Sequence, residues 1–165
     1  MSNSELRAAI EFARVYDRKV IAEAEVIGRD IECGVLEGRG QDLPRTSVLG
    51  EPIVLRNHLF YDYNAKYIDL NDIDLKIPAD LPDHVTQQIR ALSARVFEEF
   101  GCEGLARVDF FYTERGEILL NEINTMPGFT PSSMYPLLWA ATGVSYTQLV
   151  DELIQLALHR EVGLR

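Results

Sequence analysis

Two apolar segments joined by a turn signal constrain the fold of this chain more than any other feature. They lie between Ala106 and Phe129, in the stretch ARVDFFYTERGEILLNEINTMPGF. The turn signal is TERG at positions 113–116, and apolar residues precede and follow it. Apolar segments around a short polar turn that ends in glycine are typical of a β-hairpin. The sequence therefore predicts two antiparallel strands here, and with them part of a β-sheet.

The register of this hairpin brings charged side chains together. A loop centred on residues 115 and 116 places Asp109 opposite Glu122 and Arg107 opposite Asn124. All four side chains then share one face, because side chains alternate along a strand. Directly opposed residues have Cβ atoms about 4.5–5.5 Å apart, and like charges there are destabilising. If apolar neighbours shield Asp109 and Glu122 from water, the pair needs a counter-cation or a shared proton.

Mg²⁺ suits the oxygen atoms on this face. It usually binds one or two carboxylates together with substrate phosphates and water. Glu122 and Asn124 converge from one strand while Asp109 approaches from the next, and two ions about 3.5–4 Å apart would fit two bridging carboxylates. The alternative is a structural ion-pair cluster in which Arg107 neutralises Asp109. The pattern favours metal binding and leaves the ion-pair alternative open.

Bulk composition limits what the chain does. Its 165 residues, of which 47% are hydrophobic and 25% charged, suit one globular domain over residues 1–165. The net charge of −10 argues against nucleic-acid binding, because no basic face neutralises phosphates. No apolar run reaches the about 18 residues of a membrane helix, and the charged N-terminus is unlike a secretory signal. We therefore expect a cytoplasmic protein with no membrane partner, whose Cys33 and Cys102 are free thiols.

Hydrophobic periodicity and turn residues place the remaining elements. Expected helices span Ser2 to Asp17, Asp83 to Phe100, Met134 to Ala141, and a last segment capped by Ser145. Expected strands span Lys19 to Ile27, Ile31 to Leu36 and Ile53 to Leu55, with a turn over 28–30 and loops over 37–52 and 56–67. Strands and helices mix without regular alternation, so the predicted class is α+β, with a largely antiparallel sheet flanked by helices.

Three motifs in this sequence resemble a known family. The motifs YDYNAKY, RVDFF and LLNEINTMPGFTPSS, in this order, are similar to the C-terminal part of D-alanine–D-alanine ligases, which belong to the ATP-grasp superfamily. The resemblance runs from about Lys19 to the last helix. It implies the C-terminal half of an ATP-grasp fold, with the N-terminal substrate domain and the first part of the ATP-grasp region absent. We therefore expect the isolated chain to be catalytically inactive.

The resemblance also implies roles for the charged face and the loop after it. The implied ligands of two Mg²⁺ ions, for which Mn²⁺ can substitute, are Asp109, Glu122 and Asn124. The groups implied to steady the oxyanion of the tetrahedral intermediate are Arg107 and the backbone N–H of Gly128. Ser133 is implied to hold the carboxylate of the second D-alanine, although it could also cap the helix that begins near Met134.

Further implied roles concern the nucleotide and the closing loop. Glu23 and the backbone of Val26 match adenine contacts, Asp30 the ribose contact, and Phe60 a ring packed on the adenine. Lys66 and Tyr67 lie in a loop that closes over the site. There the lysine meets phosphate and the tyrosine helps to close the D-alanine pocket.

The implied reaction has two steps, and the substrates are ATP and D-alanine. The carboxylate of one D-alanine attacks the γ-phosphate of ATP, which gives an acyl phosphate and ADP. The amine of a second D-alanine then attacks the acyl carbon and releases phosphate. The product, D-alanyl-D-alanine, is a peptidoglycan precursor, and enzymes of this family are usually homodimers.

Two alternatives stay open. A ligase that joins D-alanine to D-lactate or D-serine shares the same scaffold. The lactate-forming relatives typically have histidine at the position of Tyr67, so this tyrosine favours D-alanine. The second alternative is a fragment that binds nucleotide or another protein without catalysing a reaction.

Overall fold

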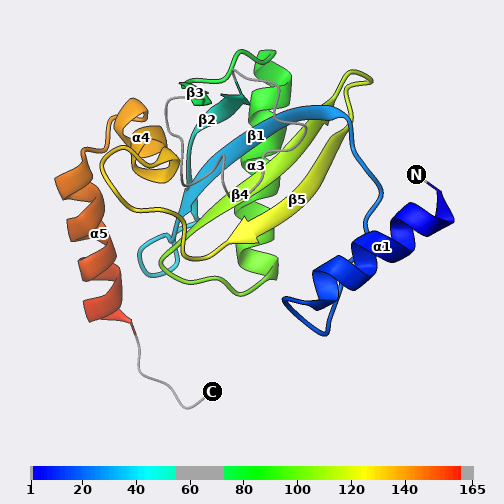
Figure 1. The fold of residues 1–165 in the computed structure, drawn as a ribbon. Helices are drawn as coiled ribbons and strands as arrows, with labels where there is room; N and C mark the ends of the chain where they lie inside the picture. The colour runs from blue at the N-terminus through cyan, green and yellow to red at the C-terminus, as the bar shows by residue number, and fades with distance from the viewer. Residues whose placement is uncertain (1, 55–72, 161–165) are drawn as a thin grey trace.

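The computed structural model describes residues 2–54 and 73–160, and Figure 1 shows their arrangement. The helices and strands are α1 (Asn3–Arg14), β1 (Gly28–Leu36), β2 (Arg45–Val54), β3 (Ile73–Lys76), α3 (Asp83–Glu99), β4 (Leu105–Thr113), β5 (Ile118–Asn124), α4 (Met134–Ala141) and α5 (Tyr146–His159). The sheet has the order β3-β2-β1-β4-β5, and every neighbouring pair is antiparallel. The α+β class with an antiparallel sheet flanked by helices is confirmed.

Helix α3 covers one face of the sheet (Figure 1). Its residues Val85, Ile89 and Phe97 are buried at the spacing of one helical face, as the sequence predicts. Alternate residues of the central strands meet them, since a strand presents every second side chain to the same face. The buried members of this core are Ile31, Cys33, Val35, Leu49, Val85, Ile89, Phe97, Ala106, Val108 and Phe110. Phe100, expected as the last residue of this helix, follows it and is 65% exposed.

Helix α4 covers part of the opposite face, over β1 and β2. A glycine lets it come close. A Cβ atom on Gly50 would lie 2.8 Å from both Leu138 Cδ2 and Met134 Sδ, closer than side chains pack. The Tyr135 hydroxyl donates to Val35 O at 2.8 Å, which ties α4 to β1. Trp139 is buried in the second core with Leu36, Tyr135, Leu149 and Leu156, as the sequence predicts for this residue.

The register of the β4–β5 hairpin is confirmed at the charged pairs and wrong nearer the turn. Arg107 pairs with Asn124 and Asp109 with Glu122, but Phe110 pairs with Leu120, so the ladder shifts by one residue. Asn121 is the extra residue of a β-bulge, which adds one residue to one strand. The turn is also displaced by one position from the prediction, since Thr113 N donates to Glu117 O at 3.0 Å. The bulge compensates for this displacement, so the charged pairs keep the predicted register.

The turn and the bulge together decide which face the acids occupy. The three-residue turn ends at Gly116, whose φ of 78° is in the left-handed region that glycine adopts without strain. Without the bulge, the pairing set by this turn would place Asn121 opposite Asp109 and turn Glu122 toward α3. The bulge also lets Ile118 and Ile123, five positions apart, both pack against the core under α3.

Several sequence-based boundaries are wrong. Residues 19–27, expected as a strand, are an extended link that leads from α1 into the sheet. The expected turn at 28–30 is the beginning of β1, where Gly28 pairs with Thr113. Strand β2 occupies half of the expected loop over 37–52, because β1 and β3 supply its ladder. The expected loop over 56–67 lies outside the described residues.

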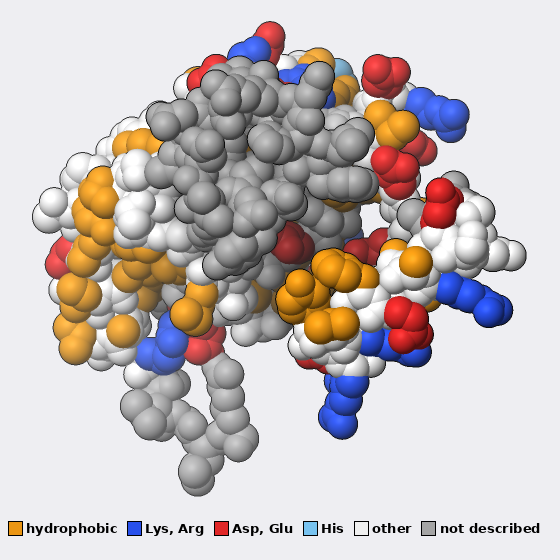
Figure 2. Space-filling model, viewed as in Figure 1, with side chains coloured by type: hydrophobic (Ala, Val, Ile, Leu, Met, Phe, Trp, Pro, Cys, Tyr) orange, Lys and Arg blue, Asp and Glu red, His pale blue; other side chains and the backbone are white. Residues whose placement is uncertain are grey.

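Helix α1 is predicted correctly but stands apart from the sheet (Figure 1). Ser2 and Glu5 form a capping box at its N-terminus, with the Ser2 amide donating to Glu5 Oε2 at 2.6 Å. Its apolar side chains are exposed: Phe12 is 66%, Val15 78% and Tyr16 77% accessible. Figure 2 shows hydrophobic side chains gathered on the surface near the C-terminal end of this helix.

Two further expectations concern the cysteines and the membrane. Cys33 and Cys102 are free thiols, as predicted, and burial raises the pKa of Cys33 to about 11. In residues 2–54 and 73–160, none of the helices combines the length and the apolar composition that crossing a bilayer demands.

Candidate functional site

Three neighbouring strands bring one arginine and three acids together on the face of the sheet opposite α3. Asp109 of β4 lies directly between Glu32 of β1 and Glu122 of β5 in the two ladders. Arg107 Nε donates to Asp109 Oδ1 at 2.8 Å, and Arg107 Nη2 donates to Asp109 Oδ2 at 2.7 Å. Arg107 Nε also lies 3.0 Å from Glu32 Oε2, and Nη2 lies 3.9 Å from Glu122 Oε1. The residues predicted to share a face therefore do so.

Burial divides these four side chains into an inner and an outer part. The side chains of Arg107, Asp109 and Glu32 are 11%, 9% and 6% exposed, whereas that of Glu122 is 48% exposed. Glu122 is the acid that a solvated ion or a substrate reaches first. Asp109 is therefore shielded from water, whereas Glu122 is shielded only in part.

The charge of the arginine is held strongly. Burial lowers the pKa of Arg107, but the hydrogen bonds to Asp109 and the charges of Glu32, Asp109 and Glu122 outweigh it and raise the pKa above its ordinary value. A guanidinium that bonds both oxygens of a carboxylate is a strong, directional ion pair. The ion-pair alternative is thus realised between Arg107 and Asp109.

The metal ligands expected from the sequence lie on one face of the sheet, in the paired strands β4 and β5. Among the residues that the structure describes, no three His, Cys, Asp or Glu side chains form a metal-binding group. Asn124 Oδ1 accepts a hydrogen bond from Met126 N at 3.0 Å, which shapes the chain as it leaves β5. Metal binding by Asp109, Glu122 and Asn124 stays a prediction, and at Asp109 an ion would compete with Arg107 for the carboxylate.

Glu32 is a member of this cluster that the sequence analysis missed. It is the one charged residue in the segment IECGVL (31–36), and it is 4% exposed. A single acid within an apolar strand is a signal for a buried, paired carboxylate, because an ionised carboxylate is rarely buried without a partner. The identity of that partner depends on the pairing of β1 with β4, which local sequence does not reveal.

The loop between β5 and α4 brings two predicted residues side by side. A Cβ atom built on Gly128 would lie 3.1 Å from Ser133 Oγ. Ser133 has the backbone position of the N-cap of α4, but its hydroxyl accepts from Thr130 N at 3.1 Å and bonds Thr130 Oγ1 at 2.7 Å. Ser133 is therefore the N-cap residue of α4, as the alternative had it, but its side chain braces the loop and makes no hydrogen bond to the helix amides.

The residues expected to contact the nucleotide are spread over a wider area. Asp30 pairs with Phe111, two positions along β1 from Glu32, so its side chain shares the face of the charged cluster. Glu23 is exposed and Val26 half-buried, both in the link before β1. Phe60, Lys66 and Tyr67 lie outside the described residues, and their roles stay predictions.

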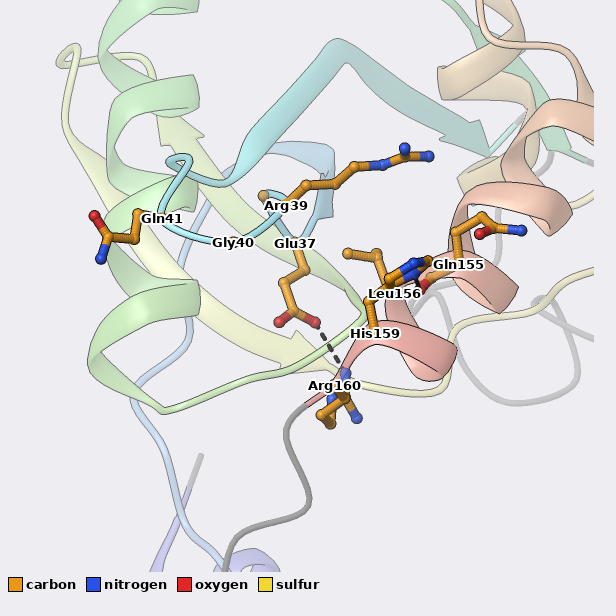
Figure 3. A pocket seen from close by; sticks show the side chains of 9 residues that line it. Glu37, Arg39, Gly40, Gln41, Gln155, Leu156, His159 and Arg160 are labelled. Atoms are coloured by element: carbon orange, nitrogen blue, oxygen red, sulfur yellow. Dashed lines mark hydrogen bonds and ion pairs between the residues drawn. The ribbon is translucent and has the colours of Figure 1, made fainter.

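A pocket of about 640 Å³ lies elsewhere, between the segment after β1 and the C-terminal end of α5 (Figure 3). Two of its charged side chains, Glu37 and Arg160, are paired with each other, and Arg160 also binds Glu103 outside the lining. Arg160 Nη2 lies 2.9 Å from Glu37 Oε2, and Arg160 Nη1 lies 3.0 Å from Glu103 Oε2. The residues that line it are Glu37, Gly38, Arg39, Gly40, Gln41, Gln155, Leu156, His159 and Arg160. This set contains no residue of the predicted site.

Comparisons with known proteins agree with the motifs. The family model described as the D-ala D-ala ligase C-terminus matches residues 1–155. A D-alanine–D-alanine ligase of Arthrobacter sp. (strain FB24) is 57% identical over 97% of this chain and 42% of its own length. One from Kineococcus radiotolerans is 56% identical over 99% of this chain and 44% of its own length. The chain thus spans less than half of the curated relatives that it matches.

Solved structures show the same relationship. The D-alanine–D-alanine ligase from Coxiella burnetii is 35% identical with a TM-score of 0.78, over 96% of this chain and 40% of that one. The VanG D-Ala:D-Ser ligase from Enterococcus faecalis is 36% identical with a TM-score of 0.79, over 94% of this chain and 44% of that one. The chain therefore belongs to the D-alanine–D-alanine ligase family, of which it matches the C-terminal part.

Proposed function

We propose that this chain supplies the metal-binding and acyl-transfer part of a D-alanine–D-alanine ligase, which joins two D-alanines at the expense of ATP. The observation that carries the proposal is the shared face of Arg107, Asp109, Glu122 and Asn124, in a chain of this family. A face with one arginine and several carboxylates repels phosphate unless bound cations neutralise the carboxylates. The excess of acid therefore favours divalent metal between the protein and the ATP phosphates.

The donor set fits Mg²⁺ or Mn²⁺. Asp109, Glu122 and Asn124 offer the hard oxygen atoms that these ions prefer, and Glu122 is open to solvent on the outer side. Two bound ions would neutralise the ATP phosphates and hold them in line for transfer. Asp109 would take part by turning one oxygen away from Arg107, which explains why a second acid beside the arginine is useful.

Arg107 and the loop after β5 suit the acyl-transfer step. That step needs donors aimed at a developing oxyanion, a role for the guanidinium of Arg107 and the N–H of Gly128. Ser133, adjacent to Gly128, lies at the N-terminus of α4, where a carboxylate is favoured by the helix dipole. We infer that this loop holds the second D-alanine through its carboxylate.

The nucleotide lies, in this proposal, along the link before β1 and the beginning of that strand. Glu23 and Val26 would contact the adenine and Asp30 the ribose, because Asp30 shares the face of the charged cluster. Phe60 would pack on the adenine, Lys66 would meet phosphate, and Tyr67 would help to close the D-alanine pocket. Closure of such a loop excludes water that would hydrolyse an acyl phosphate.

We further propose that this chain needs the upstream portion of the ligase for turnover. The relatives that it matches are more than twice as long. Helix α1 has 12 residues, and isolated helices of this length are marginal in water. Its exposed Phe12, Val15 and Tyr16 suit burial against that upstream portion, and residues 19–27 suit pairing with a further strand there. Homodimerisation of the whole enzyme also stays a prediction.

A second candidate is ligation of D-alanine to D-serine. The VanG ligase, whose name gives this activity, is as similar in structure as the D-alanine–D-alanine ligase from Coxiella burnetii. The relatives at 57% and 56% identity are both named D-alanine–D-alanine ligases, which favours D-alanine as the second substrate.

A chimeric enzyme tests the proposed reaction. This chain would replace the matching segment of the Arthrobacter ligase, with which it is 57% identical. We expect the chimera to form D-alanyl-D-alanine and ADP from D-alanine and ATP, and to prefer D-alanine to D-serine or D-lactate as second substrate. The isolated chain should form no dipeptide. Mass spectrometry of the product, with ADP release measured in parallel, distinguishes ligation of D-alanine to D-alanine, to D-serine and to D-lactate.

The unmodified Arthrobacter ligase and a chimera with Arg107→Met are the controls. A folded chimera that binds ATP but makes no dipeptide would refute the catalytic proposal. Formation of D-alanyl-D-serine as the main product would leave ligation correct and replace the substrate.

A further inference from the structure

Among the described residues of the charged face, Glu32 is an acid to which the family motifs assign no role. It comes from β1, on the other side of Asp109 from Glu122, and pairs with Asp109 in the ladder. Its residue is 4% exposed, which is unusual for an ionised side chain without a strong partner. It lies against Arg107, whose Nε is 3.0 Å from Glu32 Oε2. Arg107 is therefore held by two buried carboxylates.

The same nitrogen of Arg107 faces both acids. Nε donates its hydrogen to Asp109 Oδ1 at 2.8 Å and lies 3.0 Å from Glu32 Oε2. A small rotation of the guanidinium can therefore transfer this hydrogen bond from one carboxylate to the other. The strands fix the backbones of both acids on either side, because Glu32 and Asp109 are directly opposed in adjacent strands.

Metal binding at this site would remove part of the pairing of Arg107. Asp109 has both oxygens bonded to the arginine, so an ion that binds Asp109 competes with the guanidinium for the charge of this carboxylate. A buried guanidinium left with a broken pair is destabilised. A second buried carboxylate avoids this destabilisation, since it keeps the guanidinium of Arg107 paired while Asp109 turns toward the metal.

We propose that Glu32 is a positioning residue that holds Arg107 when Asp109 turns from the arginine to a metal ion. This inference rests on the proposed metal site. It assigns the two buried acids different tasks: Asp109 exchanges between arginine and metal, while Glu32 keeps the arginine fixed and aimed at the substrate. Exposure agrees with this division, because the side chain of Glu122, on the opposite side of Asp109, is 48% exposed and that of Glu32 is 6% exposed.

Exchange of partners can be tested on the 165-residue chain without metal. The Nε–Hε signal of Arg107 in ¹⁵N NMR spectra reports how fast this hydrogen exchanges with water. We expect Asp109→Asn and Glu32→Gln each to leave the hydrogen protected, because the other acid retains it. The double variant should exchange at least about tenfold faster than either single variant, since a charge-assisted hydrogen bond is then lost altogether. Full loss of protection in Asp109→Asn alone would overturn the proposal.

Metal affinity supplies the second measurement and separates positioning from direct ligation. We expect Glu32→Gln to weaken Mn²⁺ binding in the presence of ADP by about 10–100-fold, the usual effect of groups that orient metal ligands. In an Arg107→Met background the same substitution should change the affinity less than about twofold, because the residue acts through the arginine. An equal loss in both backgrounds would make Glu32 a direct ligand and overturn the proposal.

A matched control is Glu51→Gln. Glu51 is also a buried acid that binds an arginine with both oxygens, at 2.7 and 2.6 Å from Arg29, but Arg29 shares a side of β1 with Ile31 and Cys33 and so lies on the face of the sheet opposite Asp109. It should change neither the exchange of Arg107 Hε nor the Mn²⁺ affinity. An unmodified chain that fails to bind Mn²⁺ with ADP would refute the proposed metal site, while the NMR comparison still decides whether Glu32 and Asp109 share the arginine.

Discussion

Replacement of Arg107 by methionine is expected to lower the free energy of unfolding by about 3–5 kcal/mol, the effect of breaking a buried ion pair by removing one partner. Methionine retains much of the apolar volume of the arginine stem, so the loss comes mainly from charge. Glu32 and Asp109 are left opposite each other in adjacent strands, buried and without their shared cation. Urea denaturation monitored by circular dichroism at pH 7 measures the difference.

Two additions to the same experiment identify the cause. Lowering the pH should restore part of the lost stability, because a proton taken up by the acid pair removes its repulsion, and this gain should disappear as the pH rises again. Arg29→Met is the matched control. Arg29 binds Glu51 in the same two-bond manner, but its side chain is 38% exposed and it leaves a single acid unpaired, so its loss should cost less than that of Arg107. An equal loss in the two variants would show that burial of the charged cluster is not the cause.

Substitution of Glu122 by glutamine is expected to weaken Mn²⁺ binding in the presence of ADP by at least about 100-fold. This loss is larger than the loss of affinity expected when a group that only orients metal ligands is removed. The side chain of Glu122 is half exposed, and its contact with Arg107 is long, at 3.9 Å. It can therefore turn to an ion at little cost, whereas Asp109 must first release the arginine. Titration calorimetry or the electron paramagnetic resonance signal of free Mn²⁺ measures the affinity.

Glu117→Gln is the control for this substitution. Glu117 is an exposed acid of the same hairpin, at the turn, where Thr113 Oγ1 lies 3.3 Å from its carboxylate. The two variants lose the same charge, but only Glu122 lies opposite Asp109. The metal assignment of Glu122 is wrong if both substitutions weaken Mn²⁺ binding to the same extent. Unchanged stability in both variants would show that the effect is on binding and not on folding.

Local patterns in the sequence predict the elements that depend on near neighbours. The capping box at Ser2, the apolar stripe of α3 and the polar turn between β4 and β5 each specify a structure within a few residues. The pairs Asp109–Glu122 and Arg107–Asn124 are predicted correctly, although the turn is displaced by one position and a bulge at Asn121 restores the register. A bulge adds one residue to one strand, and periodicity alone does not locate it.

Partners distant in the chain explain the other errors. Strand β2 is polar and contains Gly50 and Pro52, so its pattern resembles a loop, yet β1 and β3 pair with its two edges. Residues 19–27 have the alternation of a strand, but in the described residues they lie outside the sheet. Glu32 was missed for the same reason. Its strand was predicted, whereas its contact with Arg107 depends on which strand pairs with β1.

The most direct test of the central claim is to locate Mn²⁺ on the chain. In ¹⁵N NMR spectra recorded with ADP, Mn²⁺ broadens the signals of amides close to it. The account predicts broadening centred on the strand pair around Asp109 and Glu122, reversed by excess Mg²⁺ and absent in Glu122→Gln. Broadening centred instead on the acids Glu37 and Glu103 beside Arg160, or no localised broadening at all, would contradict it.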